Sequence, residues 1–279
     1  MVERHFSLVV AYDGTDFSGW QRQPPPRQTV QGSLEVGLSR ILDQTITVRG
    51  CGRTDAGVHS LGQWVAFSAR STRSLKDLHR GLHAVLPGSI RVVELREASR
   101  ALDPMRESVR KTYFYQYHIG TYMPPMRYRS FAPSGPLDLS AMREASRHLE
   151  GRHDFRSFVN DADRYPSCER DLHRVRVLPV PQGVRMFFTA PGFLYNMVRT
   201  LASGLREVGR GQWSSADLLQ RLQNPDRSSG PVTAPPQGLF LFRVERSVSA
   251  AESLGSPGAE IRRASSVGIS EPVRSGIQR

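Results

Sequence analysis

The chain has 279 residues, of which 38% are hydrophobic and 23% charged, a composition typical of a globular protein with one large or two ordinary domains. No apolar run is long enough to span a bilayer and the N-terminus lacks the apolar core of a signal peptide, so we expect a cytoplasmic protein without membrane contact. The formal net charge of +12 favours a polyanionic partner, although charge alone does not separate RNA from DNA or from an acidic membrane.

Apolar patterns divide the first part of the chain into strands and helices. Strand-like patterns cover residues 5–11, 46–51, 63–67 and 90–95, and helical spacing covers residues 29–42 and 75–85. The order strand–helix–strand–strand–helix–strand is that of a split, ferredoxin-like unit. We therefore predict an N-terminal α+β half over residues 1–105.

The second part of the chain repeats this order of elements. Strands are predicted at residues 111–119, 172–178, 184–189 and 239–244, and helices at 139–149, 193–208 and 216–222. Tyr113, Tyr115 and Tyr117 alternate along one strand and so share one of its faces. The sequence thus predicts a C-terminal α+β half over residues 106–246. The whole protein would then consist of two ferredoxin-like or RRM-like halves whose antiparallel sheets join beneath a central basic cleft.

Residues 247–279 differ from the rest in composition. They are rich in Ser, Gly, Ala and Pro without apolar periodicity, so we predict a disordered tail that is dispensable for activity. The tail contains four arginines and three glutamates, and the basic excess therefore lies on the folded body.

The two cysteines, Cys51 and Cys168, lie far apart without a Cys/His cluster around them. This arrangement favours neither a disulfide framework nor a zinc site. His79 and His83 are one helical turn apart but lack further ligands, so no metal site is expected there either.

The densest chemical signal is the sequence GCGRTDAGVH at residues 50–59. Its three glycines follow a predicted strand and allow the backbone to approach another group closely. Arg53 and Asp55 are two residues apart, so an extended backbone would place both side chains on one side. An arginine partner would keep the Asp55 carboxylate ionised, as a nucleophile requires, although the same pair could simply brace the loop.

This loop and several other motifs resemble the bacterial tRNA pseudouridine synthase A (TruA) family. The resemblance extends to about residue 245 and includes these motifs in order: YDG at 12–14, GWQ at 19–21, VQ at 30–31, GRTDAGVH at 52–59, KTYFY at 111–115, DFRSF at 154–158, Phe193, MVR at 197–199, APP at 234–236 and GL at 238–239. The chain departs from the family at Arg106, which is followed by Glu107 where an aromatic residue is usual.

The resemblance implies an isomerase that converts uridine to pseudouridine at positions 38, 39 and 40 of the tRNA anticodon stem-loop. It implies that Asp55 is the catalytic aspartate, Tyr113 the active-site tyrosine against the base, Arg53 the arginine that pairs with the aspartate and helps turn the nucleotide out, and Leu239 the apolar residue that closes the pocket. It further implies a homodimer that needs no metal and no cofactor.

The residue types suit this chemistry, because turning a uridine out of a stem requires stacking surfaces and cations. Attack of Asp55 on C1′, attack on C6 and elimination through a glycal all remain open. Two other functions remain open: a non-catalytic RNA-binding protein, and a synthase acting on another RNA. A two-metal nuclease using Asp13, Asp16 and Asp55 lacks further carboxylates at matching positions. Arg199 could either line the cleft or brace Asp55.

Overall fold

The computed structural model describes residues 2–254 and 261–262. Its strands, in chain order, are β1 (Glu3–Tyr12), β2 (Arg49–Gly50), β3 (His59–Arg70), β4 (Ile90–Ala98), β5 (Ser108–Ile119), β6 (Ala132–Ser134), β7 (Gly151–Asp154), β8 (Glu169–Leu172), β9 (Arg174–Val180), β10 (Gly183–Ala190), β11 (Leu239–Arg246) and β12 (Ile261–Arg262). Its α-helices are α1 (Val30–Leu42), α2 (Leu75–Val85), α3 (Pro104–Glu107), α4 (Leu139–Ser146), α5 (Met197–Gly209), α6 (Ser215–Gln223) and α7 (Val248–Ser253).

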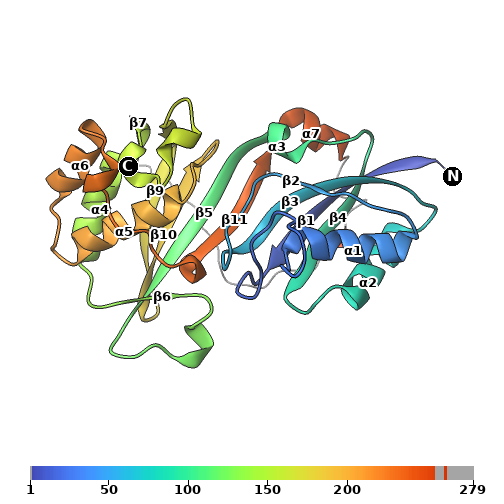
Figure 1. The fold of residues 1–279 in the computed structure, drawn as a ribbon, viewed down its shortest axis with the longest axis horizontal. Coiled ribbons are helices and arrows are strands. Elements are labelled where there is room, and N and C mark those ends of the chain that lie inside the picture. Colours follow the sequence, from blue (N-terminus) through green and yellow to red (C-terminus); the bar gives the residue numbers. More distant parts are fainter. Residues whose placement is uncertain (1, 255–260, 263–279) are drawn as a thin grey trace, which may run out of the picture.

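One ten-stranded mixed sheet runs through the molecule in the order β12–β4–β1–β3–β11–β5–β10–β9, with β2 paired to β3 and β6 to β5. Strands β7 and β8 form a separate two-stranded sheet. Helices α1 and α2 lie beside the strands of the N-terminal part, whereas α4, α5 and α6 gather at the other end of the molecule (Figure 1). The predicted combination of helices with a large sheet is therefore confirmed.

The N-terminal core forms because α1 and α2 each bury an apolar stripe on strands β1, β3 and β4. Thr29 caps α1 by accepting a hydrogen bond from the Gly32 amide, and Ser74 caps α2 by accepting one from the Asp77 amide. The helix positions facing the sheet, which are Val30, Leu34, Leu38, Leu78 and Leu82, are fully buried. Each such leucine contributes about 1.5–3 kcal/mol of burial free energy.

The C-terminal core is built on the tyrosine row of β5. Tyr113, Tyr115 and Tyr117 belong to one cluster with residues of α4 and α5, whereas Phe114 between them belongs to a cluster on the other side with Phe187 and Phe240. This alternation is the one expected of a strand with period two. The prediction that the three tyrosines share a buried face is confirmed.

Strand β11 joins the two parts of the sheet. It pairs in parallel with β3, with Phe240 opposite His59 and Leu241 opposite Ser60. On its other edge it runs antiparallel to β5, with Leu241 opposite Tyr113. The last long strand of the chain therefore lies between strands that precede it by more than a hundred residues.

Some of the predicted elements differ from the structure. The strand expected over residues 46–51 is reduced to Arg49–Gly50, although Ile46 and Val48 are buried as the pattern required. The helix expected from residue 193 begins at Met197, because Asn196 adopts a left-handed backbone conformation with φ 60°.

The predicted disordered tail is wrong at its beginning, where residues 248–253 form α7. Ala250 and Leu254 from this segment are buried in the core with Trp64. Residues 261–262 form β12, paired with β4, and the other residues beyond 254 lie outside the described part of the chain. None of the helices in the described part is long and apolar enough to cross a membrane.

Candidate active site

Residues 51–58, here called the catalytic loop, connect β2 to β3 without regular secondary structure. The loop ends at His59, where β3 meets β11, so it lies at the junction of the two parts of the sheet. The Trp20 amide donates a hydrogen bond to the Thr54 carbonyl at 3.0 Å, and the Tyr12 hydroxyl lies 2.8 Å from the Thr54 hydroxyl. Thr54 is buried, and these bonds fix the backbone immediately before Asp55.

Two glycines permit this packing. Gly19 has φ +91°, and a Cβ there would lie 2.7 Å from the Thr54 carbonyl oxygen. Gly57 has φ +77°, and a Cβ there would lie 2.9 Å from Cγ of Pro236. Because other residues disfavour these conformations and have no room for a side chain, the GW and GRTDAG motifs need glycine at both positions.

A buried amide supports the first residues of the loop. Gln63 on β3 is fully buried; its Oε1 accepts a hydrogen bond from the Cys51 thiol at 2.9 Å and its Nε2 donates to the Gly52 carbonyl at 2.8 Å. Burial also raises the pKa of the Cys51 thiol, which favours its protonated, donating form. Nothing in the local sequence around Gln63 identified this contact in advance.

The Asp55 carboxylate is partly buried, with 31% of its side chain exposed, and faces Arg199 of α5. Nη1 of Arg199 lies 3.4 Å from Oδ2 of Asp55. The guanidinium is fixed in turn, because it donates to the Ala234 carbonyl at 2.7 Å and to Oδ1 of Asn196 at 2.8 Å. Of the two roles considered for Arg199, the structure therefore supports bracing of Asp55.

Burial and Arg199 act in opposite directions on Asp55. Desolvation raises the pKa of the carboxyl and the nearby Arg199 charge lowers it; desolvation is the larger effect, so the pKa lies above its ordinary value. The sequence suggested instead that an arginine partner would dominate. The carboxylate that results is poorly solvated and held in one orientation, which suits a nucleophile.

The predicted pairing of Arg53 with Asp55 is wrong. Arg53 is exposed and makes no ion pair with Asp55 in the described part of the chain. The alternation rule behind the prediction applies to extended strands, but residues 53–55 lie outside any strand, between a bend at residues 51–52 and a turn at residues 56–57. Arg53 instead borders a neighbouring pocket with Trp20 and Gln21.

Tyr113 is buried on β5, and its ring meets that of Phe193 edge to face, with centroids 5.2 Å apart. Burial raises its pKa well above the ordinary value, and the negative charges that Cys51, Tyr12 and Asp55 can carry raise it further. Tyr113 therefore lies within electrostatic reach of Asp55 and keeps its proton at neutral pH.

Leu239 is the first residue of β11 and is buried opposite Tyr115 in the ladder. The preceding Gly238 packs under the Tyr115 ring, where a Cβ would lie 2.6 Å from Cζ. The structure thus places Leu239 beside the tyrosine row, at the end of the 231–238 segment that also contacts Arg199 and Gly57.

Asp13 and Asp16, the other carboxylates considered, are both bound by Arg129, at 3.0 Å and 2.6 Å. His59 is buried; its Nδ1 accepts a hydrogen bond from the Gly14 amide at 3.0 Å, and its ring stacks on Phe240 at 4.5 Å. Burial lowers the pKa of His59 and so favours the neutral ring. Within the described residues, no group of three or more His, Cys, Asp or Glu side chains could hold a metal ion.

The chain is similar to a known protein family over most of its length. A family model described as tRNA pseudouridine synthase matches residues 8–102 and 145–245, which include the catalytic loop, Arg199 and Leu239. A tRNA pseudouridine synthase A of Pseudothermotoga lettingae is 37% identical over 245 residues, covering 87% of this chain and 99% of that protein.

Two further relatives have the same name. The protein of Maridesulfovibrio salexigens is 36% identical over 244 residues, covering 86% of this chain and 90% of that protein. The protein of Thermosipho africanus is 37% identical over 245 residues, covering 86% of this chain and 99% of that protein. The similarity thus spans nearly the whole length of these relatives.

Proposed function

This chain belongs to the tRNA pseudouridine synthase family, and from that premise we propose that it isomerises uridine to pseudouridine at positions 38, 39 and 40 of the tRNA anticodon stem-loop, with Asp55 as the catalytic nucleophile. The observation that carries the assignment is the oriented carboxylate of Asp55, which is partly buried and lies 3.4 Å from Nη1 of Arg199. Carboxylates in such positions serve as nucleophiles in other enzymes.

The reaction breaks the N1–C1′ bond of uridine, turns the uracil and joins C5 to C1′; N1 gains a proton and C5 loses one. No atom leaves the substrate apart from exchangeable protons. Attack of the carboxylate on C1′, attack on C6 and assisted elimination to a glycal all require Asp55 to be ionised. Arg199 supports each route by holding one carboxylate oxygen, which leaves the other available to the substrate.

Tyr113 and Arg53 take different parts in this proposal. The raised pKa of Tyr113 makes its phenolate unfavourable, so we assign its ring a contact with the base and its hydroxyl a role as proton donor or hydrogen-bond partner. Arg53, exposed at the edge of the loop, supplies a cation where the uridine leaves its stack. Leu239 closes the apolar side of the pocket.

The finer architecture is also part of the proposal. The strand order β2–β3–β1–β4 and the order β9–β10–β5–β11 are equivalent, which supports two ferredoxin-like halves, residues 1–105 and 106–246. The family resemblance further favours a cytoplasmic homodimer that works without metal or cofactor.

The test uses unmodified tRNA transcripts with uridine in the anticodon arm, incubated with wild-type or Asp55→Ala protein. Pseudouridine is mapped by carbodiimide-dependent primer-extension stops. We expect stops at positions 38–40 with wild type only, and tRNA affinity of the variant within about tenfold of wild type, because the carboxylate itself adds no attraction for phosphate.

Stops elsewhere in the tRNA would assign a different site to the enzyme. Ordinary turnover by Asp55→Ala would remove the nucleophile assignment. Binding of tRNA by both proteins without any stops would favour an RNA-binding role instead.

A further inference from the structure

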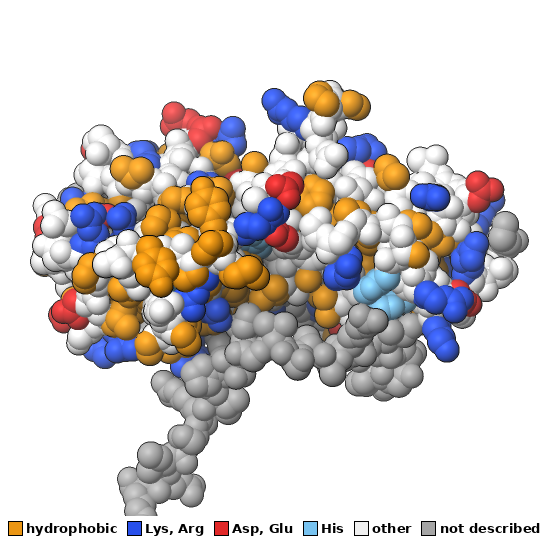
Figure 2. All heavy atoms as spheres, turned by 90° about the horizontal axis from the view of Figure 1, so that it is seen from below, with side chains coloured by type: hydrophobic (Ala, Val, Ile, Leu, Met, Phe, Trp, Pro, Cys, Tyr) orange, Lys and Arg blue, Asp and Glu red, His pale blue; other side chains and the backbone are white. Residues whose placement is uncertain are grey.

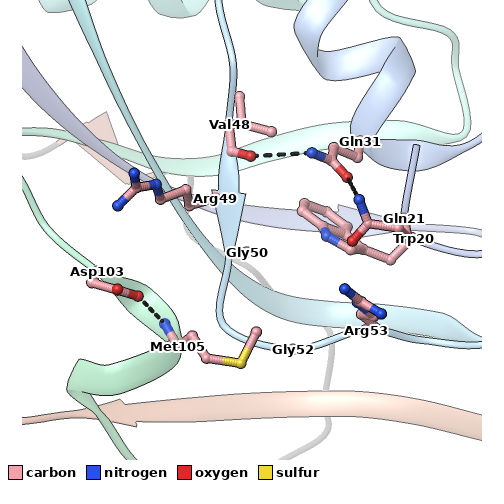
Figure 3. Close-up of a pocket in the computed structure, with 10 residues that line it drawn as sticks. All are labelled: Trp20, Gln21, Gln31, Val48, Arg49, Gly50, Gly52, Arg53, Asp103 and Met105. Carbon is pink, nitrogen blue, oxygen red and sulfur yellow. Dashed lines mark hydrogen bonds between the residues drawn. The ribbon is translucent and has the colours of Figure 1, made fainter. Parts of the chain in front are cut away.

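A pocket of about 300 Å³ lies beside β2, next to the catalytic loop but separate from the Asp55–Arg199 pair. Its walls come from four parts of the chain: the Trp20–Gln21 segment, the start of α1, β2 with its flanking residues, and α3. In Figure 3, Arg53 lies near Trp20 and Gln21 on one side of β2, Arg49 extends from the other side, and Met105 points toward Gly52. Of the residues that line this pocket, only Arg53 has a part in the reaction proposed above.

One wall of the pocket is fixed by hydrogen bonds. Gln31, which is buried, donates through Nε2 to the Val48 carbonyl at 3.2 Å and accepts through Oε1 from Nε2 of Gln21 at 2.8 Å (Figure 3). Gly50 packs so closely on the Trp20 ring that a Cβ there would lie 2.6 Å from it. The wall is therefore preformed, and a ligand binding there need not order it.

The basic residues at the pocket have no acidic partner among the residues that the structure describes. Arg49 and Arg53 line it, and Nζ of Lys111 lies 3.6 Å from the position that a Cβ on Gly52 would occupy. The side chains of these three residues make no ion pair or hydrogen bond in the part of the chain that the structure describes. This differs from Arg110 and Arg129, which bind carboxylates.

The one acidic residue of the lining, Asp103, is already engaged. Its Oδ1 accepts hydrogen bonds from the amides of Met105 and Arg106 at 3.1 Å and 3.4 Å, as the N-cap of α3. Its Oδ2 lies 3.7 Å from Nε of Arg106. The free charges that remain are cationic, and they suit an anion with several oxygen acceptors, such as a phosphate.

We propose that this pocket binds a nucleotide adjoining the target uridine in the RNA strand, with its phosphate held by Arg49 and Arg53 and its ribose or base against Met105. The proposal rests on the proposed function, because it takes Asp55 as the site of the uridine. Arg53 and Asp55 are two residues apart, so their Cα atoms are within about 7 Å, close enough for consecutive nucleotides. The volume of the pocket is at the lower end of the range for small-ligand sites.

The first test removes one charge in each of two variants of the full chain. Arg49→Gln changes an exposed pocket residue. Arg40→Gln changes an exposed α1 residue that has no ion pair among the described residues, about 13 Å along the helix from Gln31. For an anticodon stem-loop RNA we expect Arg49→Gln to raise KM and Kd about five- to tenfold and to leave kcat within about twofold. The slope of log Kd against log salt should fall by about one, whereas Arg40→Gln should match wild type.

The second test separates charge from shape at one position. Met105 is 54% exposed and stands in the first turn of α3, where an acidic residue is compatible with folding. Met105→Glu and Met105→Gln have nearly equal side-chain volumes. We expect the glutamate to weaken RNA binding at least about fivefold more than the glutamine, because its charge would oppose the phosphate.

Each outcome decides between the two proposals. If Arg49→Gln binds RNA like Arg40→Gln, or if Met105→Glu binds like Met105→Gln, the pocket is not a nucleotide site, and wild-type turnover still supports the proposed function. If wild type forms no pseudouridine but Arg49→Gln lowers both affinity and salt slope, the pocket remains an RNA site and the proposed reaction is wrong.

Discussion

Two opposing effects act on the pKa of Asp55, and their balance determines the state of its carboxyl group. Burial raises its pKa, and Arg199 limits that rise. The arrangement leaves a carboxylate that gains more from contact with an electrophile than a fully solvated one does. It also makes the enzyme sensitive to any change at Arg199, which lies 144 residues further along the chain.

This balance gives a pH prediction. If Asp55 is the nucleophile, as proposed, then kcat/KM should fall as pH drops through a pKa that lies above that of an ordinary aspartate. Arg199→Met removes the charge that lowers the pKa of Asp55, so the acid limb of the kcat/KM profile of this variant should move to higher pH. Its kcat at neutral pH should also fall about tenfold or more, because the carboxylate loses its orientation. The pH profiles of both proteins test this; coincident acid limbs would show that Arg199 does not act on the charge of Asp55.

The same pKa shift predicts a gain in stability when the charge is removed. A carboxyl whose pKa is raised on folding stabilises the fold when protonated and loses that contribution as pH rises through the folded-state pKa. Asp55→Asn should therefore raise Tm at neutral pH, by about 1–3 °C, and have no effect in acid. Asp163→Asn is the control, because it changes an exposed aspartate that makes no ion pair within the described part of the chain. A lower Tm for Asp55→Asn at neutral pH would contradict the prediction.

At the scale of single residues, the sequence did not predict contacts between residues that lie far apart along the chain. The GRTDAGVH motif identified Asp55, and the alternation of β5 identified the buried side of Tyr113. The partner of Asp55 was chosen wrongly because local spacing offered Arg53, whereas α5 and the 231–238 segment bring Arg199 into place. Local spacing did not predict the role of Gln63 either, because its contacts with Cys51 and Gly52 depend on the bend of the loop.

Among the elements, those with strong periodicity were predicted well. Helix α2 matches its predicted range, and β1, β3, β4, β5 and β11 contain theirs. The short elements β6, β7, β8 and α3 carry too few residues for a pattern. Helix α7 was missed because its six residues are small or polar apart from Val248, and only Ala250 among them is buried.

Helix α7 changes what a truncation should do. Removing residues 247–279 would expose the core that Ala250 and Leu254 cover, and would remove the bond from the Ser99 amide to the Ser253 carbonyl. Burial of one leucine and one alanine, with the lost hydrogen bonds, amounts to about 2–4 kcal/mol, so Tm should fall by about 5–10 °C. Removing residues 263–279 alone retains every contact described here and serves as the control. Equal Tm values for the two truncations would show that α7 contributes nothing to the fold.

At the scale of the whole molecule, positive charge is spread over the face that Figure 2 shows. Basic side chains lie at many places on the face in Figure 2, with hydrophobic side chains gathered to the left of its middle. Composition predicted this charge, but the order of strands could not reveal that β11 would be shared between β3 and β5. Pairing between distant strands depends on the full set of tertiary contacts, which local patterns do not contain.

The distributed charge predicts salt-sensitive tRNA binding. If three or more arginines neutralise phosphates, affinity should fall at least about tenfold between about 50 mM and about 200 mM salt, because bound counterions are released. Fluorescence anisotropy with labelled tRNA over that range measures the slope. Affinity that stays constant would mean that the basic surface does not contact the phosphate backbone.

The position of β11 also has a consequence for synthesis on the ribosome. Strand β3 and strand β5 leave the exit tunnel early, but the strand that fills the space between them is completed only at Arg246. Until then each nascent half has an open edge that could pair with another chain, a situation in which chaperones protect unfinished proteins. Any product of premature termination before β11 would also lack Leu239 and the junction beside Asp55. The enzyme therefore cannot act on RNA until β11 has been synthesised.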